Sequence, residues 1–160
     1  MFTWNWVVPN ALAAGSLPID TENIRELHAS GIRSILTLTE HPLTERAAVG
    51  SNTIAQLGID YRHVPIPDNY PPDDAQTEEI IAYIDQMQDR GKPLFFHCLM
   101  GMGRTGTIMH LYFLAHGLPI DQVRTRVYQA RPECVNLTAV QKAYVEQYAA
   151  KQFARGKTIL

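Results

Sequence analysis

One ten-residue segment brings together side chains that could carry out chemistry on a phosphate group. It runs from His97 to Gly106 with the sequence HCLMGMGRTG, so that five residues separate Cys98 from Arg104. A cysteine thiolate is a strong nucleophile. A guanidinium binds two phosphate oxygens at once through its planar N–H groups. The spacing therefore predicts a nucleophile and an anion clamp at the two ends of one short loop.

The elements that flank this loop must make the two groups converge. Residues 94–97 are apolar and predict a short buried strand, and the pattern from Arg104 onward predicts a helix. The first turn of a helix has N–H groups without partners, and its dipole attracts negative charge. The same field should stabilise a thiolate on Cys98. Glycines let the backbone wrap closely around an oxyanion. The residues expected to bind phosphate are Leu99, Met100, Gly101, Met102, Gly103 and Arg104.

The whole chain has the composition of an ordinary globular protein. Its 160 residues, 46% hydrophobic content and net charge of −2 predict a single domain over residues 1–160. The charge balance gives no sign of nucleic-acid binding, and no apolar run is long enough to span a membrane. The N-terminal segment lacks the pattern of a signal peptide. With only two cysteines, and histidines without metal-ligand spacing, we expect a cytoplasmic protein without a metal.

Strand and helix patterns alternate along the chain. Strands are predicted over residues 32–38, 59–64 and 94–97. Helices are predicted over residues 21–29, 45–57, 74–90, 104–116 and 138–153, and another has Pro119 in its first turn and ends before Arg131. This alternation predicts an α/β fold with a central, mainly parallel sheet flanked by helices on both faces.

A loop rich in proline carries the candidate proton donor. Residues 65–72 contain four prolines and cannot form a regular helix, so they predict a stiff loop. This loop holds Asp68, 30 residues before Cys98, as a group that could protonate a leaving oxygen. The alternatives are Asp60, Asp73 and Asp74. Asp60 suits the start of a strand, and Asp74 suits the N-cap of the following helix.

Taken together, these residues resemble a known family. The cysteine, five residues and arginine are similar to the signature loop of the protein tyrosine phosphatase superfamily. The flanking His97 and Thr105-Gly106 are similar to the dual-specificity phosphatases. Further segments resemble the small atypical members of the VHZ type: Trp6 to Pro9, Leu36 to Glu40, Ile66 to Asp68 with Pro71-Pro72, and Arg131-Pro132. The similarity extends from about Trp6 to Tyr148.

The resemblance implies hydrolysis of phosphate monoesters in two steps, with no metal and no cofactor. Cys98 would attack phosphorus to form a phosphocysteine while Arg104 clamps the phosphate oxygens. Asp68 would act as general acid and then as general base. Thr105 would hydrogen-bond the cysteine sulfur, unless it is an ordinary residue of the helix. The expected partners are phosphorylated proteins or small phosphate monoesters, with oxyanions such as phosphate, sulfate or vanadate as site ligands.

Three residues are expected to support the site. His97 would orient the loop through hydrogen bonds to the backbone. Glu40 would brace the loop of residues 98–104, the phosphate loop, from a neighbouring strand end, or else be a solvated turn residue. Relatives use a glutamine to position the hydrolytic water; four residues after Pro132 this chain has Asn136 instead, with Gln141 as the alternative.

Two other functions use similar residues. A rhodanese-like sulfur transferase also has a loop cysteine among backbone amides, but it needs no general acid such as Asp68. A non-catalytic phosphopeptide-binding module would have lost the cysteine or the arginine, and both are present. The neutral side chains of the loop favour phosphotyrosine, phosphoserine or phosphothreonine on proteins over phosphoinositides. Cys134 is a spare cysteine or the partner of a reversible disulfide with Cys98.

Overall fold

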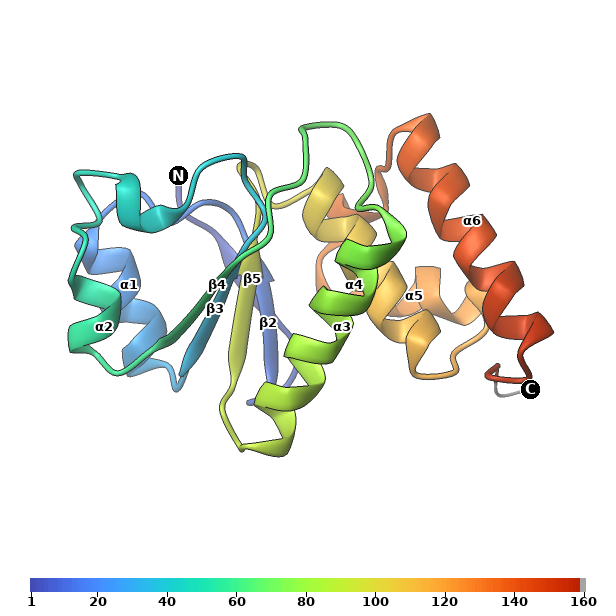
Figure 1. Cartoon of the computed structure of the whole chain (residues 1–160), viewed down its shortest axis with the longest axis horizontal. Coiled ribbons are helices and arrows are strands. Elements are labelled where there is room, and N and C mark those ends of the chain that lie inside the picture. The colour runs from blue at the N-terminus through green and yellow to red at the C-terminus, as the bar shows by residue number, and fades with distance from the viewer. Residues whose placement is uncertain (159–160) are drawn as a thin grey trace.

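The computed structural model describes residues 1–158 and has a five-stranded sheet with helices on both faces (Figure 1). The strands lie in the order β1 (Trp4–Val8), β2 (Leu12–Gly15), β5 (Leu94–His97), β3 (Ser34–Thr37) and β4 (Asp60–His63). Strands β2, β5, β3 and β4 are parallel, and only β1 runs antiparallel to its neighbour β2. The predicted α/β fold with a mainly parallel sheet is confirmed.

Alternate residues of the central strands supply two separate cores. Ile35 and Phe95 pack on one face, with α1 (Thr21–Ala29) and α2 (Thr53–Gln56). Leu36 and Phe96 pack on the other face, because successive side chains of a strand point in opposite directions. That second face is covered by α3 (Asp74–Asp89), α4 (Gly103–Ala115) and α5 (Ile120–Ala130), and α6 (Ala139–Ala154) packs against α4 farther from the sheet (Figure 1). No helix within the described residues is long and apolar enough to cross a membrane.

The carboxyl ends of the parallel strands fix where chemistry can occur. His97, the last residue of β5, lies level with Thr37 of β3 and Gly15 of β2. The chain leaves β5 into the Cys98 loop and leaves β3 toward Glu40. Both segments therefore emerge at the same edge of the sheet, where open α/β sheets bind their ligands.

The loop with four prolines joins β4 to α3, as expected, and α3 begins with a tight cap. The cap is Asp73 and not Asp74: the Asp73 carboxylate accepts from the Gln76 N–H at 2.7 Å, and the Gln76 side chain bonds back to the N–H of Asp73. This reciprocal pair satisfies two N–H groups that would otherwise lack partners. It anchors the end of the loop that carries Asp68.

One predicted helix is wrong, and one hairpin has no counterpart among the predicted elements. Residues 45–57 do not form one helix; the chain makes a short 3₁₀ turn, η1 (Leu43–Glu45), and then the single turn of α2. Gly50 breaks the segment with a φ of 78°, a left-handed conformation that does not fit a right-handed helix. The β1–β2 hairpin was not predicted at all. Its second strand, LAAG, has no β-branched residue and is a strand because β5 pairs with it.

Candidate active site

The loop from Cys98 to Gly103 is held in shape by a glycine. Gly101 has a φ of 70°, and a Cβ at this position would lie 2.5 Å from the Gly15 carbonyl carbon and 2.7 Å from a nitrogen of Arg131. Both the left-handed backbone and the lack of space exclude a larger residue. The sharp turn brings the backbone of the loop around the Cys98 side chain.

The N–H groups of this loop remain available. Among the described residues, no hydrogen bond is donated by the backbone N–H groups of residues 99–105 to a carbonyl or side chain. Helix α4 begins at Gly103, and no side chain caps its N-terminus. The free N–H groups of the loop therefore lie next to the positive end of the helix dipole. Such a combination is suited to binding an anion.

Cys98 is the first residue of this loop. Its side chain is buried, with 3% of the residue exposed, and its sulfur accepts a hydrogen bond from the Thr105 hydroxyl at 3.1 Å. A hydroxyl that donates to sulfur stabilises negative charge there. The structure thus brings together the two residues that sequence analysis proposed as nucleophile and hydroxyl donor.

Arg104 is buried at the first turn of α4, and all but one of its nitrogens have partners. Nη1 donates to the Glu40 carboxylate and, at 2.9 Å, to the carbonyl of Ile66, while Nη2 lies 3.4 Å from Oδ1 of Asp68. Nε is buried and has no hydrogen-bond partner within the described residues. A buried donor of this kind costs free energy unless a ligand satisfies it. The guanidinium is therefore fixed on one side and free to bind an oxyanion on the other.

Asp68 is the acidic residue of the proline loop that reaches the site. Its side chain is 60% exposed, and Oδ1 accepts from the N–H of Asn69 at 3.0 Å. The three alternatives have other partners: Asp60 binds Lys92 at 2.5 Å, Asp73 caps α3, and Asp74 accepts from the Tyr144 hydroxyl at 2.9 Å. Of these four aspartates, Asp68 is the one that lies beside Arg104.

Glu40 lies against the same guanidinium from the segment after β3, with its side chain half exposed. Slight burial acts to raise the pKa of Glu40, but the hydrogen bond and charge of Arg104 outweigh it and hold that pKa below its usual value. Glu40 is therefore a carboxylate that orients Arg104. Within the described residues, the side-chain hydrogen bond of Glu40 is made to this arginine.

His97 connects the loop to the sheet. Its Nδ1 donates to the carbonyl of Cys98 at 2.8 Å, which leaves Nε2 to accept from the Thr37 hydroxyl at 2.8 Å. The ring is fully buried, and this burial lowers the pKa of His97 to about 4, with the charge of Arg104 acting in the same direction. His97 is therefore neutral at pH 7, and its two hydrogen bonds hold the loop against β3.

Arg131 and Cys134 hold the loop from the other side. The buried Arg131 donates from Nε to the carbonyl of Gly101 at 2.8 Å and from its other nitrogens to Asn5 and Thr3 of the N-terminal segment. Cys134, in the 3₁₀ turn η2 (Pro132–Val135), donates its S–H to the same carbonyl at 3.2 Å. Burial raises the pKa of the Cys134 thiol to about 12, so it stays protonated. Neither residue was expected from the sequence to support the Gly101 carbonyl. The available signal was an arginine directly before a proline at a helix end.

A family model decides what kind of domain this site belongs to. The model for the DSP-PTPase phosphatase domain of the "Swiss Army Knife" protein PTP-SAK matches residues 2–154. The chain belongs to the DSP-PTPase phosphatase family. The resemblance stated from the signature loop is thereby confirmed.

Two curated relatives illustrate how far the similarity reaches. The DSP-PTPase chain is 26% identical over 152 residues to phosphatidylglycerophosphate phosphatase PTPMT1 of Arabidopsis thaliana, covering 94% of this chain and 44% of that protein. It is 32% identical over 73 residues to dual specificity protein phosphatase 1 of Mus musculus, covering 44% of this chain and 20% of that protein. The chain thus spans less than half the length of either relative.

Solved structures share the DSP-PTPase fold along nearly the whole chain. Tk-PTP in its active form superimposes with a TM-score of 0.79 at 23% identity, covering 92% of this chain and 97% of the other. The crystal structure of PTPMT1 gives a TM-score of 0.80 at 16% identity, with 96% and 98% covered. At these identities the likeness shows the common fold.

A small pocket opens beside Arg104 in this DSP-PTPase. It has a volume of about 170 Å³ and includes Glu40, Arg46 and Asp68 in its lining. Leu99 forms one wall, and its side chain is half exposed. The entrance is therefore open and partly apolar.

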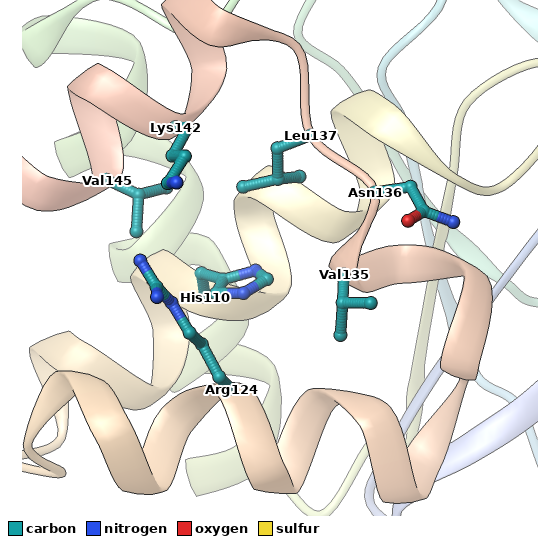
Figure 2. A pocket seen from close by; sticks show the side chains of 7 residues that line it. All are labelled: His110, Arg124, Val135, Asn136, Leu137, Lys142 and Val145. Atoms are coloured by element: carbon teal, nitrogen blue, oxygen red, sulfur yellow. The ribbon is translucent and has the colours of Figure 1, made fainter.

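The two amides considered for positioning water lie in different places. Gln141 is fully buried, and its side-chain amide would be 3.2 Å from a Cβ built on Gly103, so it lies against the phosphate loop. Its Oε1 accepts from the N–H of Thr138, and its Nε2 reaches the Tyr70 carbonyl at 3.4 Å. Asn136 instead lines a separate cavity, and its amide points away from the other lining residues (Figure 2). Of the two, only Gln141 contacts the phosphate loop.

Proposed function

We propose that this DSP-PTPase hydrolyses phosphate monoesters through a covalent phosphocysteine on Cys98. The observation that carries the proposal is the set of donors around the buried Cys98 sulfur: the unpartnered N–H groups of residues 99–105 and the unpartnered Nε of Arg104. A phosphoryl group presents three non-bridging oxygens that donors of this kind can bind. Fixed donors of this kind bind a transition state without reorganisation, which is the largest catalytic effect in many enzymes.

In the first step, the Cys98 sulfur attacks phosphorus in line with the leaving oxygen. The S–P bond forms as the P–O bond to the leaving group breaks. Asp68, 3.4 Å from Arg104, gives its proton to the departing oxygen, since an alkoxide or phenoxide leaves poorly without one. Arg104 and the loop amides hold the three oxygens of the phosphoryl group throughout.

In the second step, water attacks the phosphocysteine and the S–P bond breaks. The Asp68 carboxylate now takes a proton from the water, and the Thr105 hydroxyl, 3.1 Å from the sulfur, stabilises the returning thiolate. Gln141 is the amide placed to position this water, because it lies against Gly103. No metal or cofactor takes part in the scheme.

The pocket supports substrates that present a single phosphate group. Besides Arg104, the only Arg or Lys among the described residues that line it is Arg46. Phosphotyrosine, phosphoserine and phosphothreonine on proteins fit this charge, and the open entrance accommodates all three. The exposed Leu99 in its lining is apolar, which also suits a lipid phosphate such as the one named for the PTPMT1 relative. Comparing a phosphotyrosine peptide with phosphatidylglycerophosphate in micelles separates the two classes.

The direct test is hydrolysis of p-nitrophenyl phosphate by the wild type and by Cys98→Ser, side by side and with a chelator present. We expect turnover by the wild type alone. Circular dichroism and phosphate binding by the Cys98→Ser protein serve as the control for folding. Near-normal turnover by the variant would sink the scheme, and phosphate binding without turnover by the wild type would indicate a binding module.

A further inference from the structure

A second cavity lies between α4, α5, α6 and the segment after η2, and the proposed reaction does not use it (Figure 2). Its volume is about 310 Å³. The residues that line it are His110, Arg124, Val135, Asn136, Leu137, Lys142 and Val145. None of them lines the pocket beside Arg104, and none is acidic.

His110 contributes an unpartnered nitrogen to this cavity. The residue is only 2% exposed, and its Nδ1 donates to the carbonyl of Gly106 at 2.7 Å. Because a carbonyl can only accept, Nδ1 carries the proton and Nε2 of the neutral ring carries a lone pair. Nε2 has no hydrogen-bond partner within residues 1–158. Burial, together with the charge of Arg124, lowers the pKa of His110, so the ring stays neutral near pH 7.

Two cations enter the cavity from different helices. Arg124 of α5 and Lys142 of α6 extend toward the same side of the His110 ring (Figure 2). Arg124 shares one nitrogen with Glu146 at 3.2 Å on the exposed side, and its other N–H groups are not part of that pair. Lys142 forms no ion pair with any described residue. Val135, Leu137 and Val145 supply apolar walls.

We propose that this cavity binds inorganic phosphate. Arg124 and Lys142 bind its charged oxygens, and its P–OH group donates to Nε2 of His110. Hydrogen phosphate keeps at least one P–OH at neutral pH, whereas sulfate has none and would set its lone pairs against that of the ring. A fully ionised phosphate monoester has the same disadvantage. The neutral histidine thus favours hydrogen phosphate over sulfate because hydrogen phosphate carries a proton that it can donate.

The cavity is connected to the phosphate loop through short contacts. The Gly106 carbonyl that holds His110 belongs to the first turn of α4, one residue after Thr105. Lys142 directly follows Gln141, which lies against Gly103. Inorganic phosphate is the product of the proposed hydrolysis, so the cavity is placed to respond to product. The binding itself does not depend on that function.

The test follows the imidazole signals of His110 by NMR while phosphate or sulfate is added at pH 7.5 and constant ionic strength. Phosphate should shift the Nε2 signal saturably, and sulfate should shift it far less. Arg124→Gln and Lys142→Gln should each weaken the phosphate effect about tenfold, the loss of one charged hydrogen bond. Lys151→Gln removes the same charge from α6 outside the cavity and should leave the titration unchanged.

Binding at the phosphate loop is read separately from the backbone N–H signals of Gly101 and Gly103. In the Lys142→Gln protein these loop signals should still respond to phosphate, which shows that the variant is folded. The proposal is overturned if phosphate leaves the His110 signal unmoved. It is equally overturned if sulfate acts as strongly, or if the shift persists at full affinity in both cavity variants.

Discussion

At the scale of single residues, the proposed chemistry depends most on Asp68. Its carboxyl is exposed to solvent on a loop, and its proximity to the buried Arg104 is what places it at the site. In the proposed mechanism it must donate a proton in one step and accept one in the next. The need for the donated proton depends on the leaving group, and this provides a selective test.

We predict that Asp68→Asn lowers kcat about 10²- to 10⁴-fold for phenyl phosphate, whose leaving group needs protonation. The loss should be much smaller for 2,4-dinitrophenyl phosphate, whose leaving group departs as an anion. The matched control is Asp89→Asn, at the C-terminal end of α3 and so away from the Asp68 loop. This variant should retain wild-type rates with both substrates. Equal losses with the two substrates would show that Asp68 does not act as the acid.

The residues nearest to Cys98 in sequence could be predicted, and more distant ones could not. Cys98, Arg104 and Thr105 lie within one loop and one helical turn, so their spacing alone indicates that they meet. The support from Arg131 reaches Gly101 across 30 positions of the chain, and it requires the packing of α5 and η2. Gln141 depends in the same way on where α6 docks, which explains why a count from Pro132 pointed to Asn136.

At the scale of elements, the phosphate loop is a turn clamped between β2 and Arg131. Gly101 occupies the narrowest point, where a Cβ would meet the Gly15 backbone at 2.5 Å. Gly91, which follows the end of α3, has nearly the same φ of 66° but nothing within 4 Å. The two glycines therefore separate the cost of backbone conformation from the cost of crowding.

We predict that Gly91→Ala lowers the free energy of unfolding by about 1 kcal/mol, the cost of a left-handed alanine. Gly101→Ala should lower it by roughly 2–5 kcal/mol, because overpacking adds to that cost. It should also weaken phosphate binding, which Gly91→Ala should leave intact. Urea unfolding and phosphate titration measure both effects, and similar values for the two variants would contradict the clamped loop.

The elements that could be predicted are those with a strong local pattern. Helix α1 has its capping Asp20 and its buried Ile24 and Leu27 where the sequence indicates them. The short strand β2 could not be predicted in this way, because small residues become a strand only when β1 and β5 pair with it. Residues 45–57 do not form the predicted helix because Gly50, with its left-handed backbone, interrupts the segment.

At the scale of the whole molecule, the protonation of His97 makes the free energy of unfolding depend on pH. The ring is buried between β3 and the phosphate loop and stacks on Phe95 at 5.6 Å. Its pKa is about 4 in the folded protein because of burial, against 6.5 for a free histidine. The unfolded chain therefore binds a proton on this residue at a higher pH than the folded protein does.

We predict that stability is greatest above pH 6.5 and declines as the pH falls toward 4, with His97 contributing roughly 3 kcal/mol to the decline. Urea unfolding between pH 7.5 and 4.5 measures this slope. His97→Gln should flatten it, whereas the same change at the exposed His41 should not. An NMR titration in which the His97 ring of the wild type protonates near pH 6.5 would refute the argument without any variant.

Mass spectrometry can detect the covalent intermediate on Cys98. Asp68→Asn protein, which lacks the base for the second step, is mixed with 2,4-dinitrophenyl phosphate, quenched in denaturant within the first turnover and digested for mass spectrometry. We expect one phosphoryl group on the peptide that contains Cys98, and none on that peptide in the Cys98→Ser protein. Phosphoryl transfer to any other residue, or release of dinitrophenol without labelling of Cys98, would contradict it.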